Sequence, residues 1–105
     1  MEKESKNRQR VIDDMMALMK RSEAEGLVWC SSKTDLMEMT HILYDAELVR
    51  DAQGLPVTFQ ELVRRVCAIV HVAVPGNPNH LVSRARQRKG RRMLPLLARY
   101  EGMFI

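Results

Sequence analysis

Apolar residues recur at intervals of three and four along most of this chain, which is the spacing of one face of an α-helix. Near the beginning, Val11, Met15 and Leu18 follow this spacing and predict a helix over residues 3–25. Gly26 comes directly after that range, where a left-handed residue is expected to end the helix. The residues before Val11 bring little apolar surface, so we expect a frayed helix or a disordered arm there.

Two further helices are indicated by residues that cap a first helical turn. Ser32 and the aspartate three residues later form a weakened capping box, which predicts a helix over residues 33–47. Thr58 and Glu61 form the complete box T-x-x-E, which predicts a helix over residues 59–73. Apolar residues at helical spacing follow both boxes, so each predicted helix has a face that can join a core.

Glycine and proline divide the rest of the chain. Residues 48–57 are two short extended pieces around a glycine turn, and residues 27–29 are a β-prone run that would be a third strand beside them. Residues 74–79 contain two prolines and a glycine, which predicts a loop. Helical spacing resumes over residues 80–89, and a last helix is expected over residues 91–101.

These elements predict a mainly α fold: one small bundle of four to five helices, helix-turn-helix-like, with at most a minimal β-hairpin. A chain of 105 residues has room for a single domain, here residues 1–105. Its 46% hydrophobic residues are too many for intrinsic disorder. The expected core consists of Leu36, Leu43, Leu62, Val66, Ile69, Leu94 and Leu97.

The apolar runs are too short for a membrane protein. The longest, residues 66–74, is far below the ~20 residues that a membrane-spanning helix needs. The first ten residues are charged and lack the apolar stretch of a secretory signal. We therefore expect a cytoplasmic protein without a membrane partner.

The residues that carry chemistry do not form a catalytic or metal-binding pattern. Two cysteines are too few for a disulfide framework or a four-ligand metal site. His41, His71 and His80 lie on separate segments without an acid or a cysteine at ligand spacing, which favours structural roles. Cys30 and His80 as nucleophile and base would have no orienting group or oxyanion donor in the sequence. We expect no enzyme, no cofactor, no metal and no small-molecule substrate.

Charge is divided unevenly along the chain. Residues 1–61 hold eight Lys or Arg and twelve Asp or Glu, a net charge of −4. Residues 62–105 hold nine Lys or Arg and one acid, a net charge of +8, and no carboxylate side chain occurs from Leu62 to Tyr100. The basic part is therefore expected to bind a polyanion or the acidic part of a neighbour, unless both parts neutralise each other within one monomer.

The basic charge is concentrated in six Lys or Arg among the nine positions from Arg84 to Arg92. Clustered arginines bind phosphates by paired hydrogen bonds and gain affinity by releasing counterions. No aromatic residue lies between Phe59 and Tyr100, which disfavours stacking on single-stranded bases. The pattern predicts binding to duplex DNA. The alternative is a helical protein–protein interaction adaptor that docks on an acidic partner.

The predicted DNA contacts fall into three groups. The basic cluster, which follows the phosphates, is Arg84, Arg86, Arg88, Lys89, Arg91 and Arg92. The polar first turn of the helix after Thr58 is expected to read base edges through Thr58, Gln60 and Arg64. Lys33 and Thr34, at the start of the preceding helix, are expected to add a phosphate contact helped by the helix dipole.

Eight methionines are many for a chain of this length. Methionine fills irregular cores and also lines adaptable partner surfaces. Five of them, Met15, Met16, Met19, Met37 and Met39, belong to the first two predicted helices. We interpret them mainly as core residues. Because small DNA regulators commonly bind as two-fold dimers, we nominate the methionine-rich first helix as the contact of a homodimer.

Three stretches, taken in order, carry a resemblance to a known family. The first is Trp29 followed by the run S-K-T-D-L-x-E that begins at Ser32. The second is the helix start F-x-E at Phe59, and the third is the run R-x-R-K-G-x-R-M-L that begins at Arg86. Together, over residues 27–101, they resemble the C-terminal region of the RteC family of conjugative-transposon regulators.

The resemblance implies a helix-turn-helix-like, DNA-binding transcriptional regulator of the excision or transfer genes of a mobile element. The chain departs from the family pattern at Pro95, where the family tends to have aspartate, and at His41, where an aromatic or aliphatic residue is usual. A short segment also replaces the long N-terminal helical domain of the full-length members.

Overall fold

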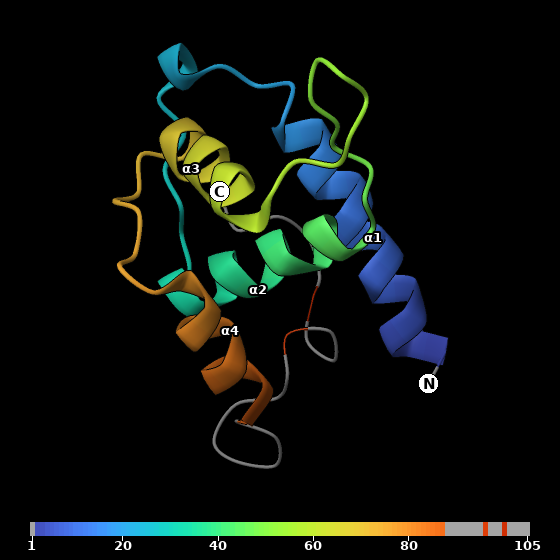
Figure 1. The fold of residues 1–105 in the computed structure, drawn as a ribbon. Helices are drawn as coiled ribbons and strands as arrows, with labels where there is room; N and C mark the ends of the chain where they lie inside the picture. Colours follow the sequence, from blue (N-terminus) through green and yellow to red (C-terminus); the bar gives the residue numbers. More distant parts are fainter. Residues whose placement is uncertain (1, 88–95, 97–99, 101–105) are drawn as a thin grey trace.

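The computed structural model describes residues 2–87, Leu96 and Tyr100 (Figure 1). Within this part the chain forms four α-helices, a short 3-10 helix and no β-strand, which confirms the predicted mainly α class. In chain order the elements are α1 (Glu2–Leu18), the 3-10 helix η1 (Glu23–Glu25), α2 (Lys33–Asp45), α3 (Phe59–Ile69) and α4 (Pro78–Gln87). The fifth helix, expected over residues 91–101, lies outside the described residues apart from Leu96 and Tyr100.

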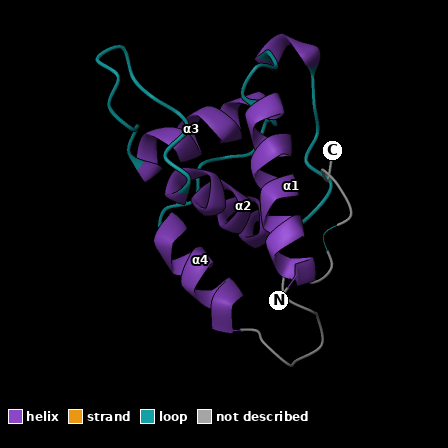
Figure 2. Cartoon of the chain, turned by 90° about the vertical axis from the view of Figure 1, so that its right-hand side faces the viewer, coloured by secondary structure: helices purple, strands orange, loops and turns teal. Residues whose placement is uncertain are grey.

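Helix α2 is the centre of the arrangement. It packs against α1, α3 and α4, and it lies between α3 and α4 in two views at right angles (Figures 1 and 2). Because neighbours cover it on several sides, seven of its thirteen residues are buried. The Cα radius of gyration of 13.4 Å agrees with the ~13 Å of a compact domain of about 100 residues.

The predicted core residues are buried where the structure describes them. Leu36, Leu43, Leu62 and Val66 have no exposed surface, and Ile69 is 7% exposed. The predicted core positions 94 and 97 lie outside the described residues. Close to them in the sequence, Leu96 and Tyr100 are also buried, so these two residues belong to the same core as the four helices.

Helices α2 and α3 begin at the two residues that the sequence indicates. The Ser32 hydroxyl oxygen accepts a hydrogen bond from the Asp35 N–H (3.0 Å), and the Thr58 hydroxyl oxygen accepts one from the Glu61 N–H (3.1 Å). The acids do not complete the boxes in the expected way. The Asp35 carboxylate accepts a hydrogen bond from the Ser31 hydroxyl (2.7 Å), and the Glu61 carboxylate pairs with arginines.

Helix α1 includes the first residues of the chain but ends earlier than predicted. Residues 2–10 continue it, and Asn7 is buried. The helix ends at Leu18 because Ser22 starts a new turn: its N–H donates to the Glu25 carboxylate (2.8 Å), and its hydroxyl oxygen accepts from the Ala24 N–H (3.2 Å). Gly26 is left-handed, as expected, although it caps η1 and not α1.

Helix α3 ends at Ile69, four residues before the predicted boundary. The end is a Schellman motif, in which the Val72 N–H donates to the Cys67 carbonyl (3.0 Å) and the His71 N–H to the Ala68 carbonyl (3.4 Å). His71 takes the left-handed position, with φ of 59°, that usually belongs to glycine. Its Nδ1–H donates to the Leu27 carbonyl oxygen (3.0 Å), which holds this side chain at the cap.

Two loop predictions need correction. Residues 48–57 turn back on themselves at Gly54, but they form only the isolated bridge between Arg50 and Pro56, and residues 27–29 are not a strand. Helix α4 begins at Pro78, inside the segment 74–79 for which the sequence predicts a loop. Proline fits the first position of a helix because the backbone N–H that it lacks would have no partner within the helix there. The Asn77 side chain accepts from the His80 N–H (3.2 Å).

Candidate nucleic-acid interface

The three residues expected to read bases gather around the start of α3. Thr58, Gln60 and Arg64 line a shallow surface depression of about 410 Å³ together with Glu61 and Val74. We call this the α3 depression. Thr58 and Gln60 are exposed, and the Arg64 side chain is 70% exposed. The start of α3 therefore offers a hydroxyl, an amide and a guanidinium to a molecule outside, and the reading of bases by these residues stays a prediction.

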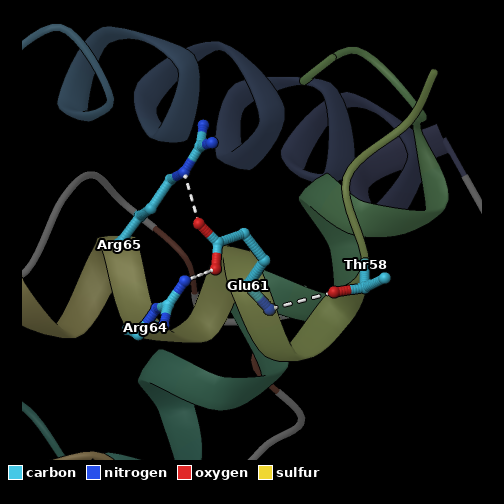
Figure 3. A network of polar contacts seen from close by, with 4 residues as sticks. All are labelled: Thr58, Glu61, Arg64 and Arg65. Atoms are coloured by element: carbon cyan, nitrogen blue, oxygen red, sulfur yellow. Dashed lines mark hydrogen bonds and ion pairs between the residues drawn. The ribbon is translucent and has the colours of Figure 1, made fainter. Parts of the chain in front are cut away.

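A carboxylate lies among these groups. The Glu61 side chain accepts from the Arg64 guanidinium through one oxygen and from Arg65 Nε (3.2 Å) through the other. Figure 3 shows Glu61 between the two arginines, with Thr58 capping the same turn. Helical spacing explains the cluster, because side chains three and four residues apart lie on one face. The Glu61 and Arg65 side chains are 30% and 41% exposed, so the cluster lies at the surface.

Arg65 also borders a second depression, on the side of α3 that faces the end of α1. This depression, of about 430 Å³, is lined by the turn after α1 and by Arg65, Ala68 and Ile69 of α3. Its charged and polar members from the first segment are Arg21, Ser22 and Glu23. The Arg21 guanidinium pairs with the Glu25 carboxylate (2.7 Å), so this arginine too has an acidic partner.

Lys33 and Thr34 are not brought to the α3 depression. The charge of Lys33 acts to lower the pKa of the thiol of Cys67, in the last turn of α3. Burial nevertheless raises the pKa of the Cys67 thiol above its ordinary value of 9.0. The residues that line the α3 depression do not include Lys33 or Thr34, so the contact predicted for these two residues would be a separate one.

The motif around the start of α2 has a structural explanation. The Trp29 indole N–H donates to the Ser32 carbonyl (2.9 Å), while Ser32 caps the helix and Ser31 donates to the Asp35 carboxylate. Asp35 is 1% exposed, and Leu36 is fully buried behind it. These hydrogen bonds fix the residue at which α2 begins. The spacing of the motif is therefore explained by the fold and needs no bound ligand.

The basic cluster is described only at its beginning. Arg84 and Arg86 belong to α4, whereas Arg88, Lys89, Arg91 and Arg92 lie outside the described residues. Helices α3 and α4 lie on opposite sides of α2 in both views (Figures 1 and 2). The structure therefore does not bring the three predicted groups into one cluster of described residues.

The connections between the helices are longer than a helix-turn-helix turn. Residues 46–58, thirteen in all, join α2 to α3, and residues 70–77, eight in all, join α3 to α4. The usual turn between the two helices of that motif has about three or four residues. The described residues thus establish a mainly α domain, and the finer helix-turn-helix likeness stays a prediction.

Two histidines have defined structural surroundings. The His41 ring packs edge-on against Phe59, with centroids 5.1 Å apart, and lies tilted against Tyr44, with centroids 5.7 Å apart. Its Nδ1 lies 3.4 Å from the carboxylate of Asp45, four residues later, which corrects the expectation that no acid lies at ligand spacing from this histidine. His71 holds the end of α3, as described above. Within the described residues, no three His, Cys, Asp or Glu are grouped in a way that could hold a metal ion.

The methionines lie mainly inside the monomer. Met15, Met37 and Met39 have no exposed surface, while Met16 and Met19 are half-buried against the core. Of the methionines in α1, only Met16 then has surface to offer to a second copy, together with Met19 in the turn that follows. Across the described part of the chain, no helix has the length and apolar character needed to span a membrane.

Comparison with known proteins brings no match: no protein-family model, no curated protein and no solved structure corresponds to this chain. The resemblance to the RteC family therefore depends on the residues quoted from the sequence.

Sequence reasoning missed Glu61 and Val74, which line the α3 depression, and Arg65, which pairs with Glu61. The pattern T-x-x-E indicates Glu61 only as a capping residue, although arginines three and four positions later are a signal for an ion pair on the same face. Arg65 is the second arginine that pairs with the Glu61 carboxylate. Val74 is 50% exposed and reaches the α3 depression from the loop after α3, a proximity that no local pattern indicates.

Proposed function

We propose that this protein binds duplex DNA and regulates transcription of the excision or transfer genes of a mobile element. The observation that carries the proposal is the charge division, with a net +8 in residues 62–105 and no carboxylate side chain from Leu62 to Tyr100. A solvated protein surface normally mixes both signs of charge. A long cationic segment without acids is instead typical of a surface that meets the phosphates of a polyanion.

In this proposal the basic cluster supplies affinity and the α3 depression supplies sequence preference. The cluster's six cations would neutralise phosphates on any sequence, which makes binding strong at low salt and weak at high salt. At the α3 depression, Gln60 can pair with adenine and Arg64 with guanine. Val74 offers an apolar surface for a thymine methyl group. These are the residue types that read base edges in a major groove.

The first experiment measures binding to random duplex DNA by fluorescence anisotropy at several salt concentrations. We expect weak, steeply salt-dependent affinity for random sequence and tighter binding to a specific site selected from genomic fragments. A protein–protein adaptor would not bind random duplex DNA at low salt. That result would refute the DNA proposal and favour docking on an acidic protein partner.

Two classes of variant separate the two roles. Replacing Arg88 and Arg92 by alanine should weaken binding to all sequences alike and reduce the salt slope by about one for each phosphate that is no longer neutralised. Replacing Gln60 by alanine should change the preference between sequences. Lys20→Ala is the matched control, because it removes an exposed cation from the acidic part of the chain. Unchanged binding after the arginine replacements would mean that the basic cluster is an ordinary solvated surface.

The regulatory part of the proposal comes from the resemblance to the RteC family. Its test is whether the site selected from the source genome lies upstream of excision or transfer genes, and whether deletion of the protein changes their transcription. Selected sites without that location would leave DNA binding in place and remove the mobile-element role.

Binding as a two-fold dimer is also proposed, with α1 and the turn after it as the contact. Met16 and Met19 are the methionines there that keep some exposed surface. Analytical ultracentrifugation with and without DNA tests this, and replacement of both by glutamate should then produce a monomer. A wild-type monomer under both conditions would exclude the dimer.

A further inference from the structure

Glu61 stands at the boundary between the acidic and the basic part of the chain. It is the last acid before the run of residues 62–100, which contains no carboxylate side chain. Its carboxylate faces the two arginines that follow it in α3. It accepts from both Arg64 and Arg65, at the edge of the α3 depression (Figure 3).

The two arginines around Glu61 present to it the donors that they would present to a phosphate. A guanidinium binds carboxylate and phosphate oxygens with the same planar arrangement of N–H groups. Both oxygens of Glu61 are used, one by each arginine. The three side chains belong to the first two turns of α3, whose N–H groups and dipole also favour an anion.

We propose that Glu61 occupies the place of a DNA phosphate in the free protein and thereby weakens its binding to non-specific duplex DNA. This inference deepens the proposed function and depends on it. Glu61 is a positioning residue: it holds Arg64 and Arg65 until bound DNA replaces its carboxylate, with a phosphate taken by both arginines on non-specific DNA and a guanine taken by Arg64 at a specific site. Non-specific DNA then gains less from these two arginines, whereas a specific site compensates through base contacts at the α3 depression.

Because Glu61, Arg64 and Arg65 lie at the surface, replacing the carboxylate by a phosphate costs little free energy. Ion pairs between exposed side chains typically contribute only about 0–1 kcal/mol, because water and salt screen them. The Arg64 and Arg65 side chains are 70% and 41% exposed, so a phosphate can reach them without unfolding of the helix. Thr58 continues to cap α3 through the Glu61 N–H, which does not involve the carboxylate.

The test compares Glu61→Gln with wild type on random duplex DNA across a range of salt concentrations. Neutralising Glu61 frees two arginines for about one further phosphate contact, which raises the salt slope by about 0.9. The same slope predicts affinity about eightfold higher at 0.1 M salt, with the difference disappearing near 1 M. Glutamine keeps the size of the side chain, and thermal unfolding of both proteins checks that the fold is retained.

The control is Glu47→Gln, which removes the same charge from an exposed residue in the connection between α2 and α3. It separates the local competition from a general increase in net charge. Adding Arg64→Gln and Arg65→Gln to the Glu61 variant should abolish the gain. Glu61→Ala is a second variant and should change affinity in the same direction.

The two proposals fail in different ways. If wild type binds DNA with a steep salt slope but Glu61→Gln and Glu47→Gln have equal affinities, the role of Glu61 is refuted and DNA binding stands. If none of these proteins binds random duplex DNA at low salt, both proposals are refuted. A gain that persists after both arginines are replaced would also refute the competition, because the arginines would not be its source.

Discussion

Tyr100 connects the end of the chain to its first helix, and the cost of breaking this connection can be worked out from the structure. Its ring is 2% exposed, and its hydroxyl donates to the Asp14 carboxylate (2.7 Å) across 86 positions of sequence. A hydrogen bond to a charged group contributes about 1.5–3 kcal/mol. Asp14 is only half-buried, so its carboxylate regains water when the hydroxyl is removed. The lower end of that range therefore applies to Tyr100→Phe.

We expect Tyr100→Phe to lower the free energy of unfolding by about 1.5 kcal/mol, which corresponds to about 7 °C in Tm for a domain of this size. Tyr100→Ala also removes the ring from the core and should cost about 3–5 kcal/mol. Urea unfolding followed by circular dichroism measures both. The matched control is Tyr44→Phe, because that side chain is 36% exposed and loss of its hydroxyl should change little.

The same contact makes a prediction about alkaline pH. Burial, with the Asp14 carboxylate accepting from the hydroxyl, raises the pKa of Tyr100 well above its ordinary value of 10.0. The fold therefore favours the neutral phenol, and this contribution to stability is present below pH 10 and lost as pH rises above it. Wild type should lose stability above pH 10 more steeply than Tyr100→Phe. Equal stability of wild type and Tyr100→Ala would refute the packing of Tyr100 in the core.

Three further changes test separate parts of the fold. Leu36→Ala, at a fully buried position of α2, should lower the free energy of unfolding by about 2–5 kcal/mol in urea titrations. Thr58→Ala removes the cap of α3 and should cost about 1 kcal/mol in the same assay. The Ser22 N–H, and then Arg21, lower the pKa of Glu25 below its ordinary 4.5. In an NMR titration, Arg21→Ala should raise that pKa without fully restoring it, and an unchanged value would contradict the pair.

Much of the helical architecture follows from local patterns in the sequence. Ser32 and Thr58 indicate the starts of α2 and α3 because a cap is made within a few residues of the chain. The apolar spacing behind them indicates Leu36 and Leu62 as core residues, and both are fully buried. Local hydrogen bonds and one buried face per helix were sufficient for these predictions.

The end of α3 depended on a contact that the sequence pattern does not contain, whereas the start of α4 follows a local rule. Helix α3 stops at Ile69 because His71 takes a left-handed conformation and its ring reaches the carbonyl of Leu27, 44 positions earlier. Neither glycine nor proline marks that end. Helix α4 starts at Pro78. Proline has no backbone N–H to donate, which excludes it from a helix interior but not from the first helical position, where that N–H would have no partner.

Some features of the candidate site follow from the sequence alone, and others depend on the tertiary structure. Sequence alone determined the residue types, the charge division and the gathering of Thr58, Gln60 and Arg64 at the start of one helix, because all of these are local properties. Only the tertiary structure placed Val74, from the loop after α3, beside these residues. Such proximities depend on how helices pack around α2, and packing joins residues by shape and burial regardless of their distance along the chain.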